Sequence, residues 1–371
     1  MDTKRLKQIY WRIYPFIRSM IRPADRQQSP SSISSGDEKL TRDCLDPWNY
    51  LEVSAEGMVK PCCILPPLEN ILQAPPDRNS NRFRELRKSL LSGELTSSCK
   101  TCHIRDMVPA RALRQKVQAI TRKNGADPDL CGPAEVQSIR IDITQDCNLR
   151  CVYCAVSQPN YAGVHMSQEV FDKVFTMIPT GRDSVRIDLN GHGETTFHPH
   201  WVDYVTRVQK TGAATTLLSN FAKPFSEAEI SAFAHVGFIQ ISLDTVDDSM
   251  LRDIRRKVSL ETIVGNIKKI KDYAKANALH PMWSISCGIY DKNVFSLGEL
   301  AAFIIQNRFN AVTFWNLVEY PMPSNTTVQV RALESLPQDE KQRAVKYANR
   351  IVDQLRRSGV DVDVAGNFLA H

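Results

Sequence analysis

Three cysteines set close together, directly after a predicted strand, constrain this chain more than any other feature. Cys147, Cys151 and Cys154 have the spacing C-x3-C-x2-C and follow the predicted strand Ser138–Thr144. A cubane iron–sulfur cluster has four irons, so three thiolates leave one iron without a protein ligand. The spacing therefore predicts a 4Fe–4S cluster with one iron open to a small chelating molecule.

Composition narrows the kind of protein to which such a cluster belongs. The chain has 371 residues, 42% of them hydrophobic, ten cysteines and a formal charge of +6. Close-set cysteines in a long chain without a secretory signal indicate reduced metal ligands rather than disulfides. The charge is mild and no basic patch carries interleaved aromatic residues, so we expect no nucleic-acid partner. These features predict a cytoplasmic protein.

The first 40 residues differ from the rest of the chain. Residues 1–22 are basic, and their apolar residues recur at helical spacing. This pattern predicts either peripheral contact with an anionic membrane surface or a terminal helix packed on its own protein. Residues 23–40 are rich in Ser, Pro and Gln, which is typical of a linker.

From Ser138 onward the pattern alternates between strands and helices. The predicted strands are Ser138–Thr144, Ser184–Asn190, Ala214–Ser219, Phe238–Asp244, Met282–Ile289 and Ala311–Val318. The predicted helices are Ser167–Ile178, His200–Lys210, Ser226–His235, Leu260–Asn277 and Phe295–Asn307. This alternation predicts an α/β fold, a partial (β/α)6 TIM-like barrel over residues 138–320. A helical connector over 106–137 precedes it. A C-terminal helical extension over 321–371 follows it, with a helix near Asp339–Arg357 and then a short apolar stretch, Val360–Val364.

The residues from Cys147 to Cys154, CNLRCVYC, resemble the signature loop of the radical S-adenosylmethionine (SAM) superfamily. The resemblance implies that SAM chelates the open iron. It also implies reductive cleavage of SAM to a 5′-deoxyadenosyl radical, with an electron supplied by a reductase such as flavodoxin or ferredoxin. The alternative is a structural zinc knuckle, although zinc usually takes four ligands from paired cysteines or histidines.

Further segments at strand ends are similar to this superfamily's SAM-binding elements. Gly191, His192, Gly193 and Glu194 resemble its Gly-Gly-Glu element, with His192 as a departure that acts as a substrate-side acid/base or as a spacer. The SAM contacts that the resemblance implies are Tyr153, Gly191, Gly193, Glu194, Ser219, Asn220, Ser242, Asp244 and Arg255. Arg252 and Arg256 are rivals of Arg255, and Asn293 is a weaker candidate.

Residues 41–105 contain a second cysteine group. The order of a first cysteine, a Gly-x4-Cys hairpin, an Arg-containing helix and a closing C-x2-C resembles the SPASM or twitch auxiliary-cluster domains of this superfamily. The resemblance implies a second 4Fe–4S cluster on Cys44, Cys62, Cys99 and Cys102, with Cys63 as a substitute for Cys62. The unit precedes the barrel, whereas those domains usually follow it. The alternative is a four-thiolate zinc site. Cys131 and Cys287 are expected to be bystanders.

These features together imply a radical SAM oxidoreductase. The expected substrate is a small polar molecule, such as a sugar or amino-sugar that is oxidised or epimerised. One alternative is a maturase that acts on a ribosomal precursor peptide. The other is a non-catalytic zinc-binding scaffold. No general acid or base is assigned.

Overall fold

The computed structural model describes residues 39–102, 104–122, 129–158, 160–181, 185–317, 329–365 and 368–369. The predicted amphipathic segment 1–22 and most of the predicted linker therefore lie outside the described residues. Within the described part of the chain, no helix combines the length and apolarity needed to cross a membrane.

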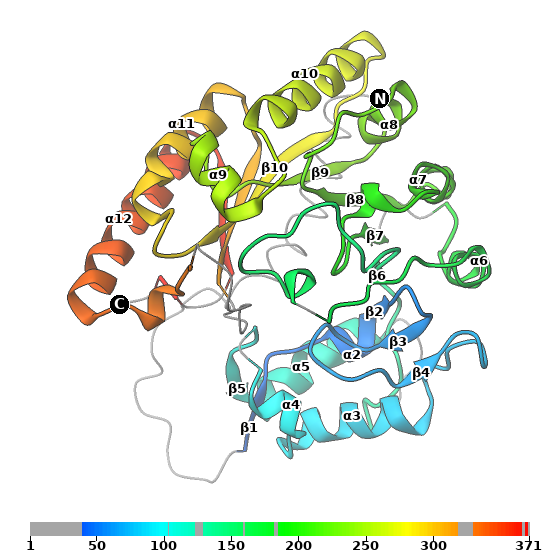
Figure 1. Ribbon diagram of the computed structural model, residues 1–371. Coiled ribbons are helices and arrows are strands. Elements are labelled where there is room, and N and C mark those ends of the chain that lie inside the picture. Colours follow the sequence, from blue (N-terminus) through cyan, green and yellow to red (C-terminus); the bar gives the residue numbers. More distant parts are fainter. Residues whose placement is uncertain are drawn as a thin grey trace.

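One ten-stranded sheet runs through the molecule in the order β12-β11-β10-β9-β8-β7-β6-β2-β3-β4 (Figure 1). Its strands are β2 (Tyr50–Val53), β3 (Met58–Lys60), β4 (Glu69–Asn70), β6 (Ser138–Ile141), β7 (Arg186–Leu189), β8 (Ala214–Ser219), β9 (Phe238–Ser242), β10 (Met282–Ile289), β11 (Ala311–Asn316) and β12 (Asp361–Ala365). All neighbours from β2 through β6 to β12 are parallel. The predicted α/β fold with a partial barrel is confirmed.

Helices cover the outer side of this curved sheet (Figure 1). They are α6 (Gln168–Thr176), α7 (Trp201–Lys210), α8 (Glu227–Ala234), α9 (Asp248–Arg255), α10 (Leu260–Ala276), α11 (Leu297–Gln306) and α12 (Gln338–Arg357). Several begin at a residue that caps the free N–H groups of the first turn. Ser226 and Glu229 form a reciprocal capping box at α8, and the Asp247 side chain accepts from Met250 N at α9.

The strands separate apolar from polar side chains because successive residues point to opposite faces. On β6, Ile139 and Ile141 are fully buried in the main core. Ser138 and Arg140 alternate with them and meet polar residues of β7, because Ser138 pairs with Arg186 and Arg140 with Asp188. The inner side of the barrel is therefore polar, which suits a ligand site.

The cysteine-rich unit packs beneath the barrel and has its own small core. It comprises α2 (Asp46–Asn49), α3 (Asn81–Ser92), α4 (Ser97–Lys100) and α5 (Ala110–Thr121), with β1 (Leu40–Arg42) antiparallel to β5 (Met107–Pro109). Trp48, Leu90, Leu113 and Val117 are buried in this core. Its hairpin β2–β3 also joins the barrel sheet, because β2 pairs in parallel with β6, Tyr50 opposite Ser138. Two separate domains were expected, but they share one sheet.

Some elements differ from the predicted ones. The tail residues 360–364, predicted only as an apolar stretch after a helix, contribute β12, which pairs in parallel with β11. The helix α9 was not among the predicted helices. The strand predicted to end at Val318 ends at Asn316, and Val318 lies outside the described residues.

Candidate functional site

The three-cysteine loop leaves the carboxyl end of β6 and is held by its own backbone. Cys154 N donates to Cys151 O at 3.0 Å, and Ser157 Oγ donates to the same carbonyl at 2.7 Å. Leu149 N donates to the Cys147 sulfur at 3.3 Å. Backbone N–H groups directed at a sulfur suit a thiolate, which is a stronger acceptor than a thiol.

Burial makes Cys147 and Cys151 poor free thiolates. Desolvation raises the pKa of Cys151 to about 12 and also raises the pKa of Cys147. A buried thiol loses its proton when a metal takes the proton's place, because coordination deprotonates it. In the described residues, no group of three or more His, Cys, Asp or Glu is arranged as the ligands of one metal ion. A cubane takes its cysteines at separate irons, so its ligands need not meet at one point.

A buried carboxylate ties this loop to the far side of the barrel. Asp244 Oδ2 accepts from Tyr153 OH at 2.6 Å and from Arg255 Nε at 3.0 Å, and both charged side chains are at most 5% exposed. Asp244 Oδ1 accepts from Gly288 N at 3.1 Å. Asn293 Nδ2 donates to Asp244 O at 2.9 Å. Four predicted residues are thus brought together, and both oxygens of Asp244 have partners within the protein.

Of the three predicted arginine rivals, Arg255 is the one that is buried beside Asp244. Arg252 is exposed and pairs with Asp248 on its own helix at 2.6 Å. Aromatic rings surround the same place, with the ring centroid of Tyr153 lying 5.7 Å from Tyr290 and 5.8 Å from Trp315. Tyr153, predicted as a SAM contact, is therefore one of three aromatic rings beside the cluster loop.

A second carboxylate gathers the predicted residues of β7 and β8. Glu194 Oε1 accepts from Ser219 Oγ at 2.7 Å, and Oε2 accepts from Asn220 N at 2.7 Å. Asn220 Nδ2 in turn donates to Asn148 Oδ1 at 2.8 Å and lies 3.8 Å from the Cys147 sulfur. Glu194, Ser219 and Asn220 are therefore brought together, next to the first cysteine.

The two predicted glycines of the β7 turn are needed for close packing on the end of β6. A Cβ on Gly191 would lie 1.8 Å from Asp142 Oδ1, and one on Gly193 would lie 2.2 Å from Asp146 O. Any side chain there would push the turn away from the loop that leads to Cys147. Ser242 ends β9 opposite Ser286 of β10 and lies in neither carboxylate network as far as the described contacts extend.

Sequence reasoning missed Asp142, which is buried and has an oxygen, Oδ1, without a hydrogen-bond partner among the described atoms. Its other oxygen lies 3.2 Å from His192 Nδ1. A signal was present, because Ser138, Arg140 and Asp142 alternate with isoleucines along one strand. That alternation directs all three toward the inner side of the barrel.

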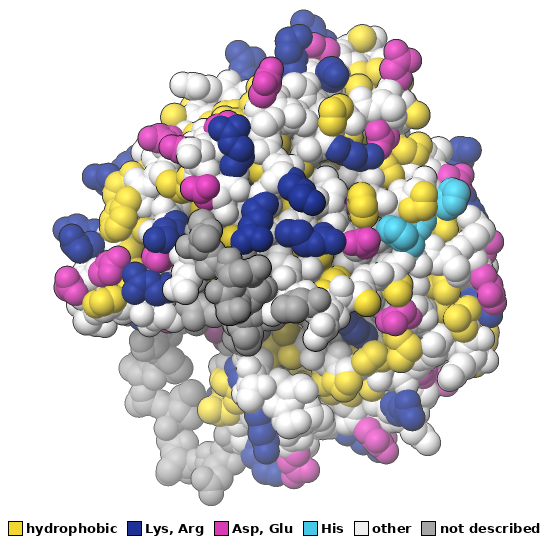
Figure 2. Space-filling view, viewed as in Figure 1, with side chains coloured by type: hydrophobic (Ala, Val, Ile, Leu, Met, Phe, Trp, Pro, Cys, Tyr) yellow, Lys and Arg dark blue, Asp and Glu magenta, His cyan; other side chains and the backbone are white. Residues whose placement is uncertain are grey.

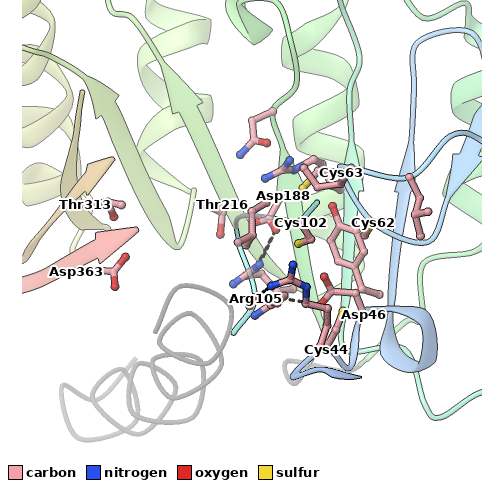
Figure 3. Close-up of a pocket in the computed structure, with 18 of the residues that line it drawn as sticks. Cys44, Asp46, Cys62, Cys63, Cys102, Arg105, Asp188, Thr216, Thr313 and Asp363 are labelled. Carbon is pink, nitrogen blue, oxygen red and sulfur yellow. Dashed lines mark hydrogen bonds and ion pairs between the residues drawn. The ribbon is translucent and has the colours of Figure 1, made fainter. Parts of the chain in front are cut away.

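The second cysteine group lines a cavity of about 280 Å³ between the cysteine-rich unit and the inner side of the sheet. Figure 3 shows Cys44, Cys62, Cys63 and Cys102 on the side formed by the unit, with Thr313 and Asp363 on the opposite side. The lining also includes Cys99 and side chains from five strands of the barrel, namely Arg140, Asp188, Thr216, Gln240 and Thr313. The sequence does not indicate how close these cysteines lie to the barrel interior. In the structure, the cysteines and the inner strands of the barrel line one cavity.

Three arginines, of which Arg87 is buried, hold the segments that carry these cysteines. Arg87, fully buried on α3, donates to Pro47 O at 2.9 Å and to Cys131 O at 2.8 Å. Arg42 Nε donates to Cys99 O at 2.8 Å. Arg105 pairs with Asp46 at 2.8 Å. These carbonyls and this carboxylate belong to segments that carry cysteines of the unit. The arginines therefore hold those segments in place.

Cys62 and Cys63 face different surroundings. Cys62 packs against the core of the cysteine-rich unit, which contains Cys99. Burial raises its pKa to about 12. Cys63 is exposed, and the charges of Arg140 and Glu52 act on it. The expected bystanders lie in apolar surroundings, because Cys131 is 2% exposed in the core of the unit and Cys287 is fully buried in the barrel core.

The surface in front of the barrel carries many basic side chains. Figure 2 shows Lys and Arg gathered near the centre of this face, next to the residues drawn in grey, with acidic side chains interspersed. This distribution agrees with the formal charge of +6.

Two family models match the chain. Residues 141–304 match the model described as the radical SAM superfamily, and residues 44–103 match the SPASM model, described as an iron-sulfur cluster-binding domain. The second match begins at Cys44 and ends just after Cys102. The first contains the three-cysteine loop and both carboxylate networks.

Curated relatives are similar over part of their length. The chain is 26% identical over 244 residues, 62% of its length and 65% of the relative, to the GTP 3′,8-cyclase of Limosilactobacillus fermentum. It is 27% identical over 137 residues, 36% of its length and 42% of the relative, to the GTP 3′,8-cyclase of Campylobacter fetus subsp. fetus. The chain therefore spans less than two thirds of either relative.

Among solved structures, Streptococcus suis SuiB bound to its precursor peptide SuiA aligns with a TM-score of 0.48 and 17% identity, over 70% of this chain and 54% of that one. The structure titled native anSMEcpe with bound AdoMet and Cp18Cys peptide aligns with a TM-score of 0.47 and 14% identity, over 61% and 62%.

The family models account for both cysteine groups, and their order along the chain is the order observed in the fold. The cofactors that go with them are SAM on a 4Fe–4S cluster and an auxiliary iron–sulfur cluster. The chain belongs to the radical SAM superfamily, as an enzyme with a SPASM iron–sulfur domain ahead of its barrel.

Proposed function

We propose that Cys147, Cys151 and Cys154 hold the SAM-binding 4Fe–4S cluster, and that Cys44, Cys62, Cys99 and Cys102 hold the auxiliary one. The observation that carries this proposal is the position of the auxiliary cysteines, which line the same cavity as the inner strands of the barrel. When bound, the first cluster and SAM supply a 5′-deoxyadenosyl radical, which takes a hydrogen atom from the substrate. The residues of the chain orient the reactants and exclude water.

The residues proposed to surround SAM lie in the two carboxylate networks and the turn after β7, apart from Ser242, which ends β9. They are Tyr153, Gly191, Gly193, Glu194, Ser219, Asn220, Ser242, Asp244 and Arg255. Asp244 and Arg255 pair with each other at 3.0 Å, so we assign them to holding the cysteine loop in place. Glu194 accepts from Ser219 and Asn220, and its charge makes this corner suitable for an ammonium group.

The substrate group is proposed to enter the cavity between the auxiliary cysteines and the barrel strands. The cavity of about 280 Å³ includes the space beside the auxiliary cysteines, which the cluster would occupy, so a substrate group would take the part that the barrel strands line. The lining has charges of both signs, among them Arg140 and Asp188, together with the hydroxyls of Thr216 and Thr313. A polar group can add hydrogen bonds to this lining. Asp188 already accepts from Ser138 and Arg186, and Thr313 accepts from Gln240.

The preferred substrate is a polar side chain of a precursor peptide. The strand β12 ends the sheet, and among the described residues no further strand pairs with its outer edge. An extended peptide can add to such an edge through backbone hydrogen bonds. Alternate residues of β12, Asp361 and Asp363, line the cavity. A peptide paired with β12 would direct its own alternate side chains to the same side.

A small polar molecule, such as a sugar or amino-sugar that is oxidised or epimerised, is the second candidate. Two observations favour it. The curated relatives are named GTP 3′,8-cyclases, which indicates a small substrate in those proteins. The face in front of the barrel also gathers Lys and Arg side chains, which suit a substrate with phosphate or carboxylate groups (Figure 2).

The predicted reductase, flavodoxin or ferredoxin, and the predicted cytoplasmic location are part of this proposal. The predicted membrane contact of residues 1–22 is a separate proposal, since these residues lie outside the described structure. Vesicle flotation of the full chain, with and without this segment, would test it.

The first experiment measures 5′-deoxyadenosine by mass spectrometry, from anaerobically reconstituted protein with SAM and dithionite. We expect product from the wild-type chain and none from Cys151→Ala. A substrate source is then added as an extract of deuterium-labelled cells, divided into peptide and low-mass fractions. Deuterium in 5′-deoxyadenosine identifies the active fraction, and its loss after protease treatment identifies a peptide.

Three results would each contradict a different part of the proposal. Label from the low-mass fraction alone would replace the peptide with a small substrate. Iron-loaded protein that binds no SAM would remove the SAM-site assignment. Colourless protein that binds zinc and no sulfide would favour the zinc-binding scaffold instead.

A further inference from the structure

A histidine and a buried aspartate form a pair where β6 and β7 end. The Asp142 side chain is buried, and its Oδ2 lies 3.2 Å from His192 Nδ1 and 3.4 Å from His192 N. Gly191 closes over Oδ1, since a Cβ there would lie 1.8 Å away. The aspartate thus holds the histidine through both its ring and its backbone.

This contact leaves the outer ring nitrogen of His192 pointing away from its partner. Because Nδ1 is bonded to Asp142, Nε2 lies on the opposite side of a side chain that is 59% exposed. His198, nearby in sequence, differs, because Nε2 pairs with Met166 O at 3.0 Å and Nδ1 accepts from His200 N at 3.0 Å. His198 uses both nitrogens to hold the fold together. His192 has one nitrogen held and one accessible, which is the arrangement of an oriented acid/base histidine.

The backbone around the pair is hydrogen-bonded to one segment of each cysteine region. Gly193 N donates to Thr144 O at 3.1 Å, which attaches the histidine turn to the segment leading to Cys147. Asp142 N donates to Val53 O at 2.9 Å, which attaches the aspartate to the hairpin of the SPASM unit. Asn190, two residues before His192, lines the substrate cavity.

Three charged groups act on His192. The hydrogen bond and charge of Asp142 raise the pKa of His192 above its ordinary value, while burial and the charge of Lys60 on β3 lower it. Glu52 on β2 adds a smaller raising effect. Asp142 makes the largest contribution, so the imidazolium is stabilised relative to that of a free histidine.

We propose that His192 transfers a proton to or from the substrate, with Asp142 as its positioning residue. The O–H or N–H bond of a polar substrate group breaks heterolytically, its proton bonds to Nε2, and the electron pair stays on the oxygen or nitrogen. The resulting imidazolium is stabilised by the Asp142 carboxylate. The inference rests on the proposed function, because it requires the substrate to lie in the cavity beside Asn190.

The pairing is tested without turnover, by measuring hydrogen–deuterium exchange at the C2 position of each histidine in the iron-loaded protein. The pKa of His192 should fall in Asp142→Asn, because the variant loses the carboxylate charge. The pKa of His235, an exposed histidine on the far end of α8, should not change. An unchanged pKa for His192 would overturn the pairing.

The proton-transfer role is tested with the labelled extract fraction that gives deuterium transfer in the wild-type enzyme. In His192→Gln, substrate-dependent turnover should fall by about 100-fold or more and lose the pH dependence that titration of His192 gives the wild-type enzyme. His235→Gln should behave like the wild type, and SAM binding should be equal in all three. Wild-type turnover and pH profile in His192→Gln would overturn the inference. Absence of 5′-deoxyadenosine from the wild-type enzyme would instead overturn the proposed function.

Discussion

The two cysteine groups are built in opposite ways. In the radical loop, Cys147 to Cys154 lie in one segment, and local backbone hydrogen bonds shape it. In the SPASM unit, the cysteines come from separate segments between Cys44 and Cys102, and arginines contact the segments that carry them. A local loop carries its geometry in its own sequence. A dispersed group acquires its geometry only when the surrounding domain folds.

The two regions also depend on charges of opposite sign. The radical loop is anchored by a buried carboxylate, Asp244, with an arginine and a tyrosine as partners. The SPASM unit is anchored by a buried guanidinium, Arg87, with carbonyl partners that include Pro47 and Cys131. Loss of either anchor leaves buried polar groups without partners, which is costly.

The largest expected difference in SAM cleavage is between variants of one cysteine from each group. Cys151→Ala should abolish 5′-deoxyadenosine formation, because the open-site cluster loses one of three ligands. Cys102→Ala should retain SAM cleavage. Each variant should lose about half of the bound iron. Iron and sulfide analysis with mass spectrometry of 5′-deoxyadenosine checks both; loss of SAM cleavage in Cys102→Ala would show that the two clusters are not independent.

The carboxylate anchor should matter next. Asp244→Asn leaves Arg255 buried without a counter-charge, which should lower the free energy of unfolding by about 3–5 kcal/mol. Asp253→Asn, an exposed position on the same α9 helix, serves as the control and should change it little. Urea unfolding of the iron-loaded proteins measures both. Equal midpoints would mean that the ion pair does not hold the loop.

The guanidinium anchor should have a somewhat smaller effect. Arg87→Ala leaves the carbonyls of Pro47 and Cys131 without their donor and should cost about 2–3 kcal/mol. The neighbouring Lys88 is exposed, so Lys88→Ala is the matched control. Iron content should fall in Arg87→Ala, and the SAM-binding cluster should be retained. A loss of iron from both clusters would contradict the separate anchoring of the two regions.

The smallest effect is expected at Cys63. Cys62→Ser should lose about half of the iron, whereas Cys63→Ser should keep its full complement, because Cys62 packs with Cys99 and Cys63 is exposed. Iron analysis of the two purified variants decides between the neighbours. The reverse result would move the ligand assignment to Cys63.

The same contrast explains what could be predicted from the sequence. The bounds of β8 and β10 agree with the predicted strands, because apolar periodicity is a local property. The radical loop could be identified because its three cysteines lie within eight residues of the sequence. The pairing of Asp244 with Tyr153 could not be predicted, because the two residues lie far apart in the chain and meet only after the barrel curves.

Two features of the sheet escaped prediction for a related reason. The hairpin β2–β3 was recognised, but its pairing with β6 joins residues separated by the whole SPASM unit. The strand β12 was seen only as a short apolar stretch after a helix. Asp142 follows the alternation of β6 inward, but a cysteine motif does not indicate which side chains lie beside the turns that pack on it.

The shared sheet has a consequence for how the protein is made. β2 emerges from the ribosome before its partner β6, so Tyr50 has no strand partner until Ser138 has been translated. At about 5–20 residues per second, the delay is roughly 4–17 s. During that time one edge of the hairpin is unpaired and can associate with other chains. The cysteines of the SPASM unit can face the barrel only after its first strand, β6, has been translated. We therefore expect the auxiliary cluster to be inserted after that point.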